Sequence, residues 1–132
     1  MRLSRAASYG IFATTHIAEK SKDSPVPGQI IAAACSIPPG HLLKVLQQLV
    51  KSRILASERG PSGGFSLRRA ANKISLLDII ESIEGPIDGE IGGFDDITGK
   101  NRAKGVAKKV CDDVAKATRT ILAKTNVSDL TA

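Results

Sequence analysis

The feature that most constrains the fold is a proline-rich turn between two short apolar segments. Residues 29–35 are rich in alanine, and residues 42–51 carry leucine and valine at about every third or fourth position. Both patterns predict short helices. The turn at residues 36–40 contains two prolines, which suit the start of a helix, and Ser36 is a candidate cap for the second helix. Two short helices joined in this way predict a helix-turn-helix.

A further helix is predicted in front of this pair, over residues 8–20. Its expected apolar face is the set repeated at helical spacing: Tyr9, Phe12, Ala13, His16 and Ile17. On that face we expect His16 to be a packed core histidine rather than a ligand. Two prolines in residues 20–28 predict a loop between this helix and the pair.

The pattern changes from helical to extended after residue 53. Residues 54–57 and 65–67 are short strand candidates, and the glycine- and proline-rich stretch 58–64 lies between them. Together they predict a hairpin, or wing, behind the helix-turn-helix. Residues 75–84 are then predicted to form an amphipathic helix, with a serine cap at its start and a Gly-Pro pair after its end.

The last clear element is a predicted helix over residues 101–124. Its apolar positions follow a heptad spacing: Ala103, Ala107, Val110, Val114, Ala117 and Ile121. At 1.5 Å per residue such a helix is about 36 Å long, which is too long for one small domain to cover. A partner helix is the simplest cover, so we expect a homodimer built on these six residues. Packing of the helix on its own subunit is the alternative.

The basic charge of the chain belongs to its first half. The net charge is +6, but residues 1–73 hold eleven lysines and arginines against three acidic residues, a balance of +8. Residues 74–132 hold eight against ten, a balance of −2. A folded unit with such an excess favours a polyanion as its partner, with nucleic acid as the first candidate, although a charge that serves only solubility is the alternative.

These patterns divide the chain into three parts. We expect a winged helix-turn-helix DNA-binding domain over residues 1–84, a flexible acidic loop over 85–100, and a dimerisation helix with a C-terminal tail over 101–132. The fold class is therefore mainly α with a small β-hairpin wing. The apolar runs are short and the N-terminus does not have the pattern of a secretion signal, so we expect no membrane span and a cytoplasmic location.

The second helix of the pair is the expected DNA-contacting element. Short polar side chains at the start of such a helix reach base edges in the major groove, where Lys44 can donate to guanine and Gln47 or Gln48 can pair with adenine. Leu43 is apolar and could contact only a thymine methyl group. Arg59 at the wing is expected to enter a narrow minor groove. The full predicted DNA-binding set is Arg2, Arg5, Pro39, Gly40, His41, Leu43, Lys44, Gln47, Lys51, Arg59, Gly60, Pro61 and Ser62, and phosphate contacts are also expected from Arg53, Arg68 and Arg69.

Several of these segments resemble the Rrf-two family of bacterial winged-helix regulators. The likeness is carried by residues 1–4, the Tyr9-Gly10 pair, residues 37–49 and, above all, the Arg-Gly-Pro-Ser-Gly-Gly-Phe-Ser-Leu sequence at 59–67. It is close up to about residue 87 and weaker beyond. The resemblance implies a dimeric repressor or activator whose long helix builds the dimer. It also implies that bases are contacted from the positions of Gly40, Leu43 and Lys44. This sequence departs from its relatives at all three positions, so its operator is expected to differ.

The same resemblance raises the question of a cofactor. Well-known members hold a two-iron two-sulfur cluster on three cysteines before the long helix, and the matching positions here are Gly92, Thr98 and Lys104. Residues 88–100 contain no cysteine, and a cluster needs several thiolate ligands. We therefore expect no iron–sulfur cluster, no other cofactor and no metal.

Two histidines and two separated cysteines offer no catalytic pair or metal set, so we expect no enzyme. The sequence leaves three further interpretations open. A protein-interaction adaptor with the winged-helix shape is an alternative to a DNA-binding regulator, which we expect to be a repressor. Cys111 is a candidate redox switch, because Lys108 and Lys109 favour its thiolate, although Asp112 and Asp113 oppose this effect and a semi-buried cysteine without a sensing role is more common. An unidentified effector or partner protein acting at the acidic loop is the third possibility.

Overall fold

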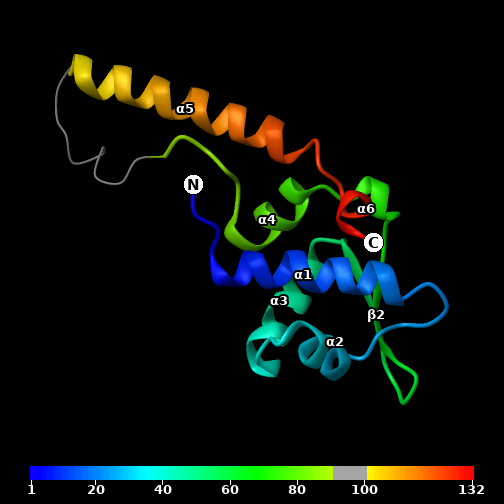
Figure 1. Cartoon of the computed structure of the whole chain (residues 1–132). Coiled ribbons are helices and arrows are strands. Elements are labelled where there is room, and N and C mark those ends of the chain that lie inside the picture. The colour runs from blue at the N-terminus through cyan, green and yellow to red at the C-terminus, as the bar shows by residue number, and fades with distance from the viewer. Residues whose placement is uncertain (91–100) are drawn as a thin grey trace.

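The computed structural model describes residues 1–90 and 101–132. The elements, in chain order, are α1 (Arg5–Lys20), α2 (Gly28–Cys35), α3 (Pro39–Lys51), β1 (Leu55–Glu58), β2 (Gly64–Leu67), the 3-10 turn η1 (Ala71–Lys73), α4 (Leu76–Glu84), α5 (Arg102–Leu122) and α6 (Val127–Leu130). In Figure 1, α1 crosses the middle of the molecule, with α2, α3 and the hairpin on one side and α5 on the other. The predicted fold class, mainly helical with a β-hairpin wing and a long C-terminal helix, is confirmed.

The turn between α2 and α3 gives the pair its helix-turn-helix geometry. The two helices are bent by 117° relative to each other across the break at residues 36–38. Ser36 adopts a left-handed conformation (φ 55°) and ends α2, so its prediction as the cap of α3 is wrong. The cap position of α3 is Pro38, and Pro39 occupies the first turn, where its missing N–H costs nothing.

The core lies where α1, α2, α3 and α4 meet behind the hairpin. Its largest fully buried side chains are Ile17, Ile31, Leu42, Leu46, Leu49, Ile54, Leu55, Ile74, Ile79, Ile80, Val127 and Thr14. Val45 is also buried, so the apolar stripe of α3 uses Val45 and Leu46 together. No single helix among the described residues is long and apolar enough to be a membrane span, and only the bent α2–α3 pair meets that criterion as a unit.

The buried face of α1 differs from the predicted one. Ala13 and Ile17 are fully buried as expected, but Phe12 is 61% exposed. The face that packs inward also carries Gly10, where an added Cβ would overlap the Ile83 side chain of α4. Small residues on this face let α4 approach closely, and this turns Phe12 outward.

The wing is a two-stranded antiparallel hairpin, in which Leu55 pairs with Leu67 and Glu58 with Gly64. The sequence did not predict a third partner: Val26 of the loop before α2 forms a β-bridge with Phe65 through two 2.8 Å hydrogen bonds. Gly64 has φ +152°, and a Cβ at this position would overlap the backbone of Val26. Glycine at this position is therefore required for the wing to pair with Val26, just before α2.

The C-terminal half begins with a capped helix and returns to the core at its end. Ser75 caps α4 as predicted and forms a capping box with Asp78. The tail after α5 forms α6, in which Val127 is completely buried and donates its N–H to the carbonyl of Ile74 at 2.8 Å. The sequence did not predict α6, which anchors the far end of α5 to the winged-helix core.

Candidate nucleic-acid interface

The outward side of α3 carries the predicted base-contacting residues. Leu42, Val45, Leu46 and Leu49 point into the core. The opposite side of the helix is exposed and consists of Pro39, Gly40, His41, Leu43, Lys44, Gln47, Gln48 and Lys51. Because burial alternates with exposure in this way, every predicted side chain of α3 is accessible on one helix face.

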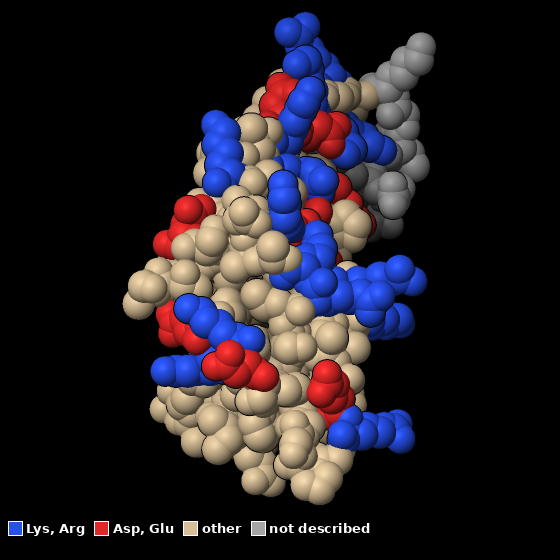
Figure 2. Space-filling model, turned by 90° about the vertical axis from the view of Figure 1, so that its right-hand side faces the viewer, with Lys and Arg blue, Asp and Glu red and all other residues tan. Residues whose placement is uncertain are grey.

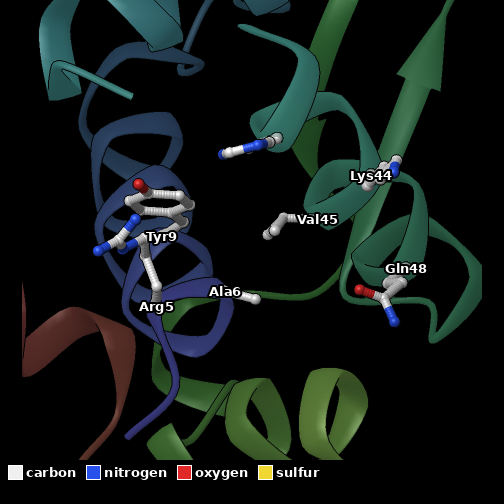
Figure 3. Close-up of a pocket in the computed structure, with 7 residues that line it drawn as sticks. Arg5, Ala6, Tyr9, Lys44, Val45 and Gln48 are labelled. Carbon is white, nitrogen blue, oxygen red and sulfur yellow. The ribbon is translucent and has the colours of Figure 1, made fainter. Parts of the chain in front are cut away.

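A cavity of about 330 Å³ separates the start of α1 from α3. Figure 3 shows Arg5 and Tyr9 projecting from α1, and Lys44 and Gln48 projecting from α3. His41 also lines this cavity. The structure thus brings Arg5 together with α3, the helix predicted to contact bases. Tyr9 packs partly against the core, as predicted for the apolar face of this helix, and it also lines this cavity.

The tip of the wing is the second exposed surface of the expected type. Arg59, Gly60, Pro61 and Ser62 are all exposed, and Gly60 has φ +104°, a conformation that favours glycine. The Gly63 N–H donates to the Gly60 carbonyl at 3.0 Å, which closes the turn. In Figure 1 the hairpin extends from the same end of the molecule as α2 and α3.

The other predicted phosphate contacts are not all in one place. Arg53 and Arg68 are exposed near the ends of the hairpin. Arg69 lies 3.8 Å from the carboxylate of Asp78 in α4. Arg2 lines a different cavity, beside α5, together with Glu84 and other residues. The structure therefore groups Arg5 with α3 but leaves Arg2 apart from it.

The apolar residues of α5 occupy two different sides of the helix. The predicted heptad residues 103, 107, 110, 114, 117 and 121, which we call the seam, are exposed except for the half-buried Ala107. Val110 is 53%, Val114 59% and Ile121 65% exposed. A second side, formed by Cys111, Ala115, Thr118 and Leu122, is at least half-buried against its own subunit. The heptad pattern of the sequence did not distinguish this inner side from the seam.

Polar contacts hold α5 to the rest of the subunit. Arg119 forms a salt bridge with Glu81 of α4, and the Lys108 ammonium donates to the carbonyl of Gly89 at 3.3 Å. Lys108 also donates to Asp112 at 2.6 Å, and this hydrogen bond raises the pKa of the lysine. The orientation of α5 is therefore fixed by α4 and by the chain just after it.

Lysine and arginine side chains also gather on α5. Figure 2 shows them over the upper part of one face, at the height of α5, with carboxylates among them. Lys108 and Lys109 pair with Asp112 and Asp113 one turn further on. Helix α5 holds six lysines and arginines but only these two aspartates, so the pairs offset only part of its positive charge.

The donor set does not fit an iron–sulfur cluster on cysteines. The sequence has two cysteines, Cys35 in α2 and Cys111 in α5, and they line different cavities. Burial raises the pKa of the Cys35 thiol, which opposes thiolate formation. Within residues 1–90 and 101–132, no group of three or more His, Cys, Asp and Glu side chains is arranged to hold a metal ion. Of the positions matching cluster ligands, Gly92 and Thr98 lie outside the described residues, and Lys104 is in α5.

Helices α1 to α4 and the hairpin define a winged helix-turn-helix with an appended long helix. Residues 3–132 match the Rrf2 family, whose description is iron-dependent transcriptional regulator. The chain therefore belongs to the Rrf2 family, which consists of transcriptional regulators and not of enzymes.

Individual relatives agree with this assignment. BadM of Rhodopseudomonas palustris, named as a candidate HTH-type transcriptional regulator, is 30% identical over 98% of this chain and 81% of its own length. IscR of Pectobacterium carotovorum, an HTH-type transcriptional regulator, is 32% identical over 67% of this chain and 54% of its own. The structure of T. potens IscR matches 98% of this chain and 85% of its own, with 25% identity and a TM-score of 0.79. The chain spans about half the length of several curated relatives that it matches, among them IscR of Pectobacterium.

Proposed function

We propose that the protein is a sequence-specific DNA-binding repressor that acts as a homodimer. In this proposal α3 enters the major groove and the wing enters the adjacent minor groove, as in other winged-helix proteins. The observation that carries the proposal is the exposed polar face of α3 at the same end of the molecule as the Arg59 wing. A bacterial chromosome lies in the cytoplasm, which is the compartment this function requires.

The roles of the residues follow from their chemistry. Lys44 and Gln47 have the donors and acceptors needed for base edges, and Arg59 has the length and charge for a narrow minor groove. Arg5 lies beside α3 and Lys51 is the last residue of α3, so both can supply positive charge to phosphates. Arg69 is ion-paired and Arg2 lies beside α5, so we give these two no DNA contact.

The homodimer is supported by the exposed seam of α5. Large aliphatic side chains more than half exposed along one side of a helix would cost free energy in water, and a second copy of the same helix would cover them. We propose that two seams pack against each other and place two copies of α3 on two half-sites of a near-palindromic operator. Each subunit then consists of a DNA-binding domain over residues 1–84, a loop over 85–100, and a dimerisation helix with its tail over 101–132. Helix α6 of the tail packs back on the DNA-binding domain.

The proposed regulator works without a cysteine-ligated cluster, so its signal is of another kind. Cys111 lies on the inner side of α5 and lines a cavity of about 430 Å³ with Ala115 and the seam residue Val114. A redox role for Cys111 therefore stays a prediction from the sequence. Peroxide treatment of wild type and Cys111→Ser, each followed by a DNA-binding titration, tests it.

The DNA-binding proposal is tested by affinity measurements on a duplex operator selected from a random library. If about six phosphates are neutralised, log affinity falls with log salt at a slope near −5. Arg59→Ala is expected to weaken binding by about 1–3 kcal/mol without lowering the melting temperature, because its side chain is exposed. The matched control is Lys116→Ala, which removes the same charge from an exposed position on α5.

Two results would contradict the proposal. Selection that yields no operator, together with no binding at low salt, favours the protein-interaction adaptor instead. Equal affinities for wild type and Arg59→Ala would show that the wing does not contact DNA.

A further inference from the structure

The exposed side of α3 contains an apolar residue, Leu43, that is not part of the buried core. Leu43 is 51% exposed, whereas the core-facing Leu42 and Leu46 of the same helix are buried. Its neighbours on the exposed side, Lys44 and Gln47, are polar. The Leu43 side chain lines one cavity of the subunit.

That cavity lies between α2, α3 and the wing. It has a volume of about 320 Å³ and is lined by Pro39, Leu42, Leu43 and Leu46 of α3, by Phe65 of β2, and by Gly28 and Gln29 at the start of α2. Gln29 is the one polar side chain in this lining. The cavity therefore offers an apolar surface next to the DNA-contacting side of α3.

The first turn of α3 extends this apolar surface outward. Pro39 and Leu43 are four residues apart and so lie above one another on the helix. Gly40, between them, has no side chain, and nothing lies within 4 Å of the position that a Cβ would take. We call Pro39, Gly40 and Leu43 the apolar strip. It contributes no side-chain donor or acceptor, so it cannot distinguish bases by hydrogen bonds.

We propose that the apolar strip recognises the 5-methyl group of pyrimidines in the major groove, with Leu43 as the specificity-determining residue. The thymine methyl is the apolar group that base edges present in that groove, and contact with it favours thymine over cytosine. Gly40 leaves room for the methyl to approach Leu43. Lys44 and Gln47 on the same helix face make duplex DNA a better occupant than an apolar small molecule. The inference rests on the proposed function, because it requires α3 to lie in the major groove.

The same contact makes binding sensitive to the methyl group alone. Uracil differs from thymine only by lacking this methyl, and 5-methylcytosine differs from cytosine only by carrying it. Burial of one such carbon contributes about a fourfold change in affinity. With one contact in each half-site, replacing both thymines by uracil is expected to lower affinity about fifteenfold.

The experiment is a uracil scan of the selected operator. Each thymine is replaced in turn, and affinity is measured for wild type, Leu43→Ala and the control Phe12→Ala, whose exposed side chain lies on α1. We expect a fourfold loss at one thymine per half-site for wild type and Phe12→Ala, and no loss there for Leu43→Ala. With cytosine at that position, 5-methylation is expected to raise affinity about fourfold for wild type and Phe12→Ala, and not for Leu43→Ala.

Several outcomes overturn the inference. A flat scan for wild type, on an operator that it binds tightly, refutes methyl recognition and leaves DNA binding intact. Equal uracil sensitivity in Leu43→Ala and wild type refutes the assignment to Leu43. Binding of the apolar dye ANS that Leu43→Ala abolishes, combined with a flat scan, assigns the cavity to an apolar small molecule. Failure to bind any duplex removes the proposed function itself, and this inference with it.

Discussion

Substitution at Val114 tests whether the α5 seam forms the dimer. Val114 is 59% exposed in the subunit, and full burial of a valine side chain contributes about 1.5 kcal/mol. Covering the exposed part is therefore expected to contribute about 1 kcal/mol per subunit, or about 2 kcal/mol for the two copies in a symmetric dimer. Val114→Ala keeps the Cβ, so we expect the dimer dissociation constant to rise by roughly 10- to 30-fold.

Val114→Asp should have a larger effect, because it places a carboxylate from each subunit in an apolar interface. Sedimentation equilibrium measures the dissociation constants, and circular dichroism checks that each variant is folded. The control is Thr120→Asp, which adds the same charge to an exposed position of α5 outside the seam. If both aspartate variants dimerise as wild type does, the seam is not the interface. The same conclusion follows if wild type is a monomer at micromolar concentration.

Two further predictions concern the stability of the winged-helix unit. Ser75→Ala removes one half of the capping box with Asp78 and is expected to lower the free energy of unfolding by about 1 kcal/mol. Urea denaturation measures this loss, with Ser128→Ala on α6 as the control. Equal stability of the two variants would contradict the prediction. Gly64→Ala forces a Cβ against the backbone of Val26, so we expect the Val26–Phe65 bridge to open and DNA affinity to fall. Amide exchange of Val26 and Phe65 checks this, and unchanged protection would show that the wing adapts.

The sequence predicted the elements whose signals are local. The two prolines before α3, the glycines of the wing and Ser75 at the start of α4 each act within a few residues, so their elements were found. Helix α5 was predicted for the same reason, since heptad spacing is a property of one segment.

The features that were missed depend on contacts between distant segments. Phe12 is exposed because Gly10 packs against α4, about seventy residues further along the chain. The sequence near Phe12 carries no signal of this contact. Ser36 was assigned to the wrong helix, since its left-handed conformation depends on how α2 and α3 meet. The tail around Val127 is too short to show a helical period, although its burial under η1 and α1 gives it a role in the core.

The salt bridge between α4 and α5 has a consequence for DNA recognition by the proposed dimer. The same Glu81 oxygen accepts from Arg119 of α5 and from the Ile87 N–H, at 2.7 Å, so one carboxylate orients α5 relative to the winged-helix unit. Glu81→Gln removes the charge that holds Arg119, but this pair is partly exposed and its loss should cost only about 1 kcal/mol of stability. Because α5 would set the distance between the two copies of α3, we expect a larger change in spacing preference than in stability. Affinities for operators whose half-site spacing varies by one base pair measure this. Wild type should prefer one spacing sharply and Glu81→Gln less so, and identical preferences would show that Glu81 does not set the spacing.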